Sequence, residues 1–183
     1  MKRAHGIVAI AIAAAAVCGV GAVAAANTTS NSGGGGRVRE ALNSYEEVPA
    51  LSSPGTGEFR ASVSRHSEEI TYRLSFGSLE SDATQAHIHF ENATNNGPIV
   101  VFLCSNLGNG PAGTQACPAA GGEISGTIRP ADIGAGAAAQ GLDAGEFQEF
   151  VRALRSGATY VNVHSVDRAG GEIRAQLDGR IPG

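Results

Sequence analysis

Hydrophobic and polar residues alternate along several short segments of the chain. In EEITYRLSF (68–76), hydrophobic residues take every second position from Ile70 to Phe76, and Thr71, Arg73 and Ser75 lie between them. A period of two is typical of β-strands that bury one face. Further strand candidates lie at 57–64, 86–90, 98–104, 122–129, 159–165 and 171–179.

Turn-forming residues separate these candidate strands. The stretches SSPGTG, ATNNGP, AAGG and RAGG are rich in Gly, Pro and Asn, and the chain of 183 residues contains 26 glycines. Short strands at this frequency, without long helices between them, favour an antiparallel sheet. The pattern predicts an all-β fold, an antiparallel Greek-key β-sandwich or barrel with one short helix.

That helix is expected in LDAGEFQEFVRALRSG (142–157). Asp143 and Glu146 have the spacing of a capping box, and Gly157 is placed to end the helix. Between them, Phe147, Phe150, Val151 and Leu154 form a hydrophobic stripe at helical spacing. We expect this stripe to pack on the sheet.

The N-terminus resembles an export signal. Two basic residues precede an apolar run that ends in Ala24-Ala25-Ala26, which fits cleavage after residue 26. We therefore expect a signal peptide at 1–26, a flexible Gly/Ser linker at 27–37 and a β-domain at 38–180. An uncleaved run would instead be a membrane anchor. Either reading indicates a secreted, periplasmic or cell-surface protein.

Removal of the signal peptide makes the charge more negative. The whole chain has a net charge of −4, and the loss of Lys2 and Arg3 leaves 11 basic side chains against 17 acidic ones, a net charge of −6. An acidic surface repels phosphate backbones, so we expect no nucleic-acid partner.

Two cysteines, Cys104 and Cys117, remain after cleavage. In an oxidising compartment an even pair at short spacing predicts a disulfide bond. A metal site built on two thiols would lack the usual C-x-x-C spacing.

Three histidines are the main candidates for chemistry. His87 and His89 are two residues apart in one strand candidate, so their side chains share a face with Cα atoms about 6.5–7 Å apart. His164 alternates with Val161 and Val163 in another strand candidate. Should the two strands be neighbours, three imidazoles would gather and suit zinc or copper, with water or Glu172 in a fourth position.

The same histidines have a structural alternative. Imidazoles also form hydrogen bonds across strands, and Asn162, Glu172 and Arg174 are available as partners or supporting residues. The residues alone leave the two alternatives open.

Three phrases together carry a resemblance: AHIHFENATNNGPIV, then GEISGTI, then YVNVHSVDRAGGEIRAQL. In order and spacing they resemble the CHRD (chordin) domain family, over roughly residues 38–177. Phe90, Ser165 and Ala175 depart from the family pattern. The resemblance implies an antiparallel β-domain in an exported protein.

The resemblance also implies a binding or structural module for a protein or cell-surface component, with an undefined ligand. No nucleophile elbow, phosphate loop or metalloprotease motif occurs in the sequence, so we expect no enzyme. The alternative function is a copper- or zinc-binding protein that uses the three histidines.

Overall fold

The computed structural model describes residues 36–64 and 68–178. The expected signal peptide and all but the last two residues of the expected linker lie outside these ranges. The strands are β1 (Arg37–Asn43), β2 (Thr56–Val63), β3 (Ile70–Gly77), β4 (Ala83–Phe90), β5 (Ile99–Ser105), β6 (Gly122–Ile128), β7 (Thr159–Ser165) and β8 (Ile173–Leu177). The helix α1 spans Phe147–Arg155, and short 3₁₀ turns lie at Ser44–Glu46, Pro130–Asp132 and Ala135–Gln140. The first strand begins at Arg37, one residue before the expected start of the domain.

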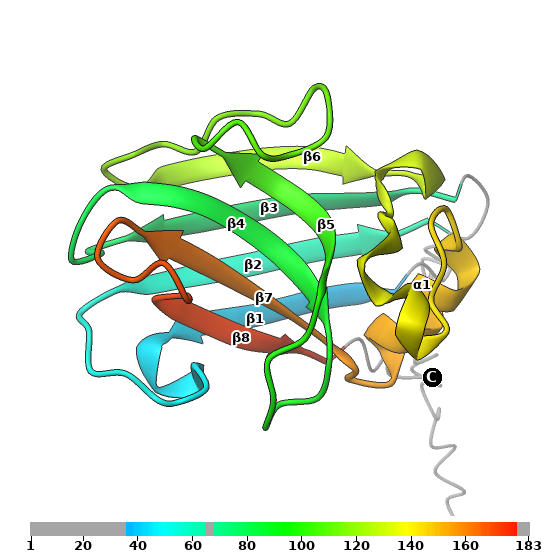
Figure 1. The fold of residues 1–183 in the computed structure, drawn as a ribbon, viewed down its shortest axis with the longest axis horizontal. Coiled ribbons are helices and arrows are strands. Elements are labelled where there is room, and N and C mark those ends of the chain that lie inside the picture. The colour runs from blue at the N-terminus through cyan, green and yellow to red at the C-terminus, as the bar shows by residue number, and fades with distance from the viewer. Residues whose placement is uncertain (1–35, 65–67, 179–183) are drawn as a thin grey trace, which may run out of the picture. The chain divides into compact units, whose positions relative to one another are not determined.

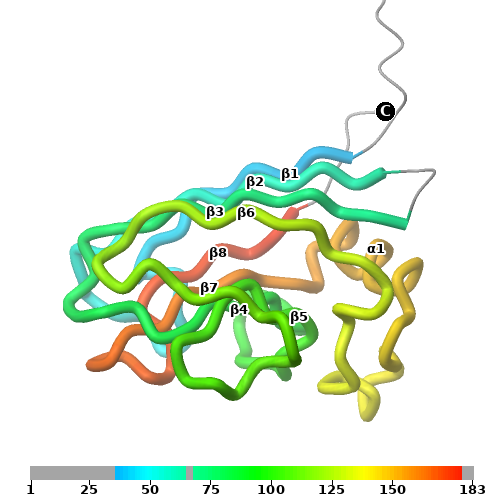
Figure 2. The backbone as a smooth tube through the Cα atoms, turned by 90° about the horizontal axis from the view of Figure 1, so that it is seen from above, coloured from blue at the N-terminus to red at the C-terminus, as the bar shows by residue number. Residues whose placement is uncertain are grey.

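The described strands form one eight-stranded sheet in the order β5-β4-β7-β8-β1-β2-β3-β6. All neighbouring strands are antiparallel (Figures 1 and 2). The two edge strands approach each other, because the Gln115 side chain donates hydrogen bonds to Leu103 O on β5 and to Ser125 O on β6. The sheet is therefore barrel-like and nearly closed. This confirms the expected all-β antiparallel fold.

The alternating residues face the core as the sequence predicts. Phe59, Leu74, Ile88 and Val161 are fully buried, each on a different strand. The strand face turned inward is thus the hydrophobic face, and the other face of each strand is left for polar residues.

The helix α1 lies beside one end of the strands (Figure 1). Its buried residues include the expected stripe of Phe147, Phe150, Val151 and Leu154. The expected start was wrong: the cap position is Glu146, and Asp143 lies outside the helix. Gly157 has a φ of +73°, in keeping with its expected role after the helix.

Cys104 and Cys117 form a disulfide bond, with their Cα atoms 5.1 Å apart. The bond ties the end of β5 to the loop before β6, and this confirms the predicted pairing. Within the described residues, no helix is long and apolar enough to cross a membrane.

Candidate metal centre

The outward face of β4, β7 and β8 carries a buried layer of polar side chains. Neighbouring strands place His87 opposite Asn162 and His89 opposite Tyr160, and Asn162 is in turn opposite Arg174. All five side chains are buried, although they point away from the hydrophobic core. Loops at 44–53, 91–98 and 166–171 lie next to this layer through Glu47, Gly97 and Ala169.

The structure brings the three predicted histidines together. His87, His89 and His164 are 0%, 7% and 6% exposed, and one nitrogen of each lies within 4.8 Å of the others. His87 Nδ1 is 3.3 Å from His164 Nε2. The cluster arises because β4 and β7 are direct neighbours in the sheet, which the sequence left as a condition.

Backbone carbonyls fix the tautomers of two of these rings. His89 Nδ1–H donates to Gly97 O at 2.9 Å, and His164 Nδ1–H donates to Ala169 O at 3.0 Å. A neutral imidazole has one N–H, so the Nε2 atom of each ring keeps a free lone pair. A metal-binding histidine usually donates such a hydrogen bond from the ring nitrogen that does not bind the metal.

Two of the ring nitrogens are buried without a hydrogen-bond partner, namely His87 Nε2 and His89 Nε2. Burial lowers the pKa of His87 to about 3, with further lowering from His164 and His89. Burial likewise lowers the pKa of His89 to about 4, and it lowers the pKa of His164. The three rings are thus neutral at neutral pH, the form in which imidazole binds a metal.

Asn162 and Glu47 lie next to the histidines. Asn162 Oδ1 is 3.1 Å from His164 Nε2, while Asn162 Nδ2 and Glu47 Oε1 both lie next to Gly171. Burial raises the pKa of Glu47 to about 7, although Arg174 and Asn162 oppose the rise, and Glu47 Oε1 has no hydrogen-bond partner. Sequence reasoning missed Glu47, because it lies between strands in a segment with no periodic pattern.

Arg174 holds the loop that supports His89. Its guanidinium lies 3.4 Å from the centre of the Tyr160 ring, and Tyr160 stacks on His89 with ring centres 4.6 Å apart. The same guanidinium donates to the side chain of Asn96 and to the backbone carbonyls of residues 92 and 95. Arg174 thereby connects the stack to the segment that presents Gly97 O to His89.

The turn at Asn96 and Gly97 has no positive φ at either residue. Gly97 is needed for close approach, because a Cβ there would lie 2.2 Å from Phe90 O.

Glu172, expected as a fourth ligand or a partner of the histidines, lies elsewhere. Its carboxylate accepts hydrogen bonds from Ser53 Oγ, Ser165 Oγ and the backbone N–H of Glu80. The alternation of β8 begins only at Ile173, and Gly171 before it has a φ of +122°. The expected position of Glu172 was wrong because the period of two does not extend through this turn.

Comparison with known proteins identifies one family. The model of the CHRD domain matches residues 38–177. No curated protein and no solved structure gives a significant match.

Proposed function

The chain belongs to the CHRD domain family, and on this premise we propose that it is an exported metal-binding module in which His87, His89 and His164 hold one zinc or copper ion. CHRD domains are typically extracellular or periplasmic, and the disulfide bond suits such a compartment. The proposed role is binding without turnover, because the surrounding loops bury the cluster and leave it little room for a substrate.

The observation that carries the proposal is that two hydrogen-bond acceptors, His164 Nε2 and Asn162 Oδ1, face each other. His164 Nε2 has no proton to donate, because its Nδ1 faces a carbonyl oxygen, yet Asn162 Oδ1 lies only 3.1 Å from it. The amide nitrogen of Asn162 lies on the other side, next to Gly171 and near Glu47 Oε1. Two acceptors so close repel each other unless a cation lies between them.

The spacing also suits a small transition-metal ion. Ligand atoms about 2.0–2.1 Å from a tetrahedral metal are about 3.3 Å apart. The contacts of His164 Nε2 with His87 Nδ1 (3.3 Å) and with Asn162 Oδ1 (3.1 Å) match this separation. Neutral imidazoles favour zinc and copper over calcium or magnesium, which prefer oxygen ligands. Asn162 Oδ1 is the candidate for the fourth position.

The test is metal titration of the chelator-treated protein. We expect about one equivalent of Cu²⁺ or Zn²⁺ to bind, and electron paramagnetic resonance of the copper form to show nitrogen couplings. His89→Ala should lose the metal while its circular dichroism stays that of the wild type. His66→Ala is the matched control, since His66 lies in a polar segment outside the described residues and should keep full binding.

Two results would contradict the proposal. One is a wild-type protein that binds no metal at micromolar concentration. The other is a copper signal that persists unchanged in His89→Ala, because the metal would then occupy a different site. If the wild type binds no metal and the histidine variants only lower the melting temperature, the histidines belong to the scaffold.

A further inference from the structure

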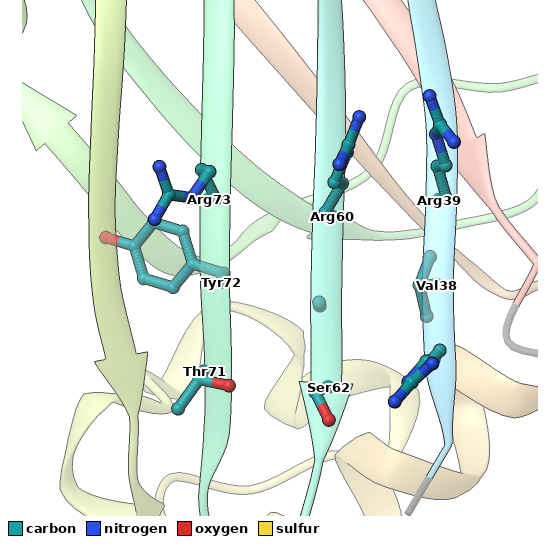
Figure 3. Close-up of a pocket in the computed structure, with 9 residues that line it drawn as sticks. Val38, Arg39, Arg60, Ser62, Thr71, Tyr72 and Arg73 are labelled. Atoms are coloured by element: carbon teal, nitrogen blue, oxygen red, sulfur yellow. The ribbon is translucent and has the colours of Figure 1, made fainter.

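A second polar surface lies on the outward face of β1, β2 and β3. Arg39 is directly opposite Arg60, and Arg60 is directly opposite Arg73, so three arginines form one row across three strands. Neighbouring strands are about 4.8 Å apart, so the row spans about 10 Å. Figure 3 shows the three side chains on neighbouring strands, where they line one pocket. We call Arg39, Arg60 and Arg73 the arginine row.

The carboxylates near this row do not balance its charge. Glu58 pairs with both Arg39 and Arg60, and Glu123 pairs with Arg73. The three arginine side chains remain 68%, 54% and 61% exposed. A fourth arginine, Arg37, lines the same pocket and is exposed.

Like charges directly opposite each other on a sheet are destabilising. Glu58 and Glu123 offset this repulsion only in part, because exposed ion pairs contribute little, so the strands gain little stability from the row. It is also local, because the chain as a whole has a net charge of −4. A row of cations on an acidic protein complements a ligand with regularly repeated negative charges.

The next row of the face carries the hydroxyl groups of Ser62, Thr71 and Thr127, which we call the hydroxyl row. Arg37 is opposite Ser62, Ser62 is opposite Thr71, and Thr71 is opposite Thr127 on β6. Hydroxyls beside guanidinium groups offer hydrogen bonds to the hydroxyls of a sugar as well as to its acidic groups.

We propose that the arginine row and the adjacent hydroxyl row bind a linear acidic polysaccharide that carries carboxylate or sulfate groups. The inference is independent of the metal site, which lies over other strands. It gives a chemical class to the cell-surface component expected from the family resemblance.

Two other polyanions fit this face less well. Single-stranded nucleic acid is bound by stacking its bases on aromatic rings, and the only aromatic residue that lines the pocket, Tyr72, is 8% exposed. A membrane surface is bound with apolar anchors, and the exposed large hydrophobic residues in the described ranges, Tyr45, Leu107 and Val166, do not line the pocket.

The experiment measures binding of the full chain to heparin, polygalacturonate and uncharged dextran at low salt. We expect binding to heparin or polygalacturonate and none to dextran, and the preferred polymer identifies sulfate or carboxylate as the recognised group. The triple variant Arg39→Gln, Arg60→Gln, Arg73→Gln should bind about tenfold or more weakly, since each arginine lost removes a charge contact.

The control removes three arginines that do not line the pocket, with Arg152→Gln, Arg155→Gln and Arg168→Gln. It should keep the wild-type affinity within about twofold, because it changes the net charge equally. Equal losses in the two triple variants would overturn the proposal, as would absence of polysaccharide binding. Tighter binding to a DNA oligonucleotide or to phosphatidylglycerol vesicles would assign the face to another class of partner. Circular dichroism checks that both variants are folded.

Discussion

Acid should destabilise the metal-free protein through its buried histidines, and Glu47 should hide part of the effect. The perturbation is a change from pH 7 to pH 5 in the presence of a chelator, for the wild type and for Glu47→Gln. Glutamine keeps the shape of the side chain and removes its titration. The free energy of unfolding is the measured quantity.

The histidine contribution follows from their lowered pKa values. The pKa of His87 is about 3 and that of His89 is about 4, below the value of about 6.5 for the unfolded chain. Between these values the unfolded chain binds protons that the folded protein does not, so stability falls as the pH falls. Between pH 7 and pH 5 the two histidines together lower the free energy of unfolding by about 4 kcal/mol. His164, whose pKa is also lowered, acts in the same direction.

Glu47 acts in the opposite direction. Its pKa in the folded protein is about 7, above the ordinary value of 4.5. At pH 5 the folded protein therefore holds a proton on Glu47 that the unfolded chain has largely lost. On its own, this adds about 2 kcal/mol to the free energy of unfolding between pH 7 and pH 5. The wild type should lose about 2 kcal/mol between pH 7 and pH 5, and Glu47→Gln should lose about 4 kcal/mol.

Urea denaturation at pH 5, 6 and 7, followed by circular dichroism, measures both profiles. Other carboxylates titrate equally in the two proteins, so the difference between the profiles isolates Glu47. Parallel profiles would refute the raised pKa of Glu47. Flat profiles for both proteins would refute the claim that the histidines are buried in their neutral form.

Three further predictions concern the disulfide bond and the loop at 91–98. The double variant Cys104→Ser, Cys117→Ser should lose about 3 kcal/mol in urea denaturation, and thiol labelling of the unreduced wild type should find Cys104 and Cys117 unreactive. Gly97→Ala should lower the melting temperature, because its new Cβ would clash with Phe90 O; an unchanged value would mean that the loop moves freely. Arg174→Gln should weaken zinc binding about tenfold, measured by calorimetry, because it loosens the support of His89; unchanged affinity would show that Arg174 does not position the site.

The sequence predicted most of the strands and the faces of the histidines. Period-two alternation is a local property, so β7 was found at its observed bounds and His164 was placed on the face opposite Val161 and Val163. The disulfide bond could also be predicted, because only one pair of cysteines remains after the expected cleavage.

The environment of the histidines could not be predicted in the same way. Alternation shows that an imidazole points away from the core, but not whether a loop then covers it. The burial of His87 and His89 depends on the loop at 91–98, which Arg174 and Tyr160 hold through long-range contacts. Glu47 joins the site from a loop with no periodic pattern. Glu172 was misplaced for the same reason, since a glycine turn ended the alternation.

The arginine row likewise could not be predicted from local sequence patterns. Each of Arg39, Arg60 and Arg73 is one outward residue of an ordinary strand, and no local pattern marks them as neighbours. Their alignment follows from the pairing registers of β1 with β2 and of β2 with β3, and a shift by two residues in either pairing would separate them. Because the strands of this sheet bury their inner face in the core, the outer face is the part of the sheet left for polar sites. There, covering loops favour a site for a small desolvated ion over β4 and β7, while Arg39, Arg60 and Arg73 on β1, β2 and β3 are exposed to a large, charged partner.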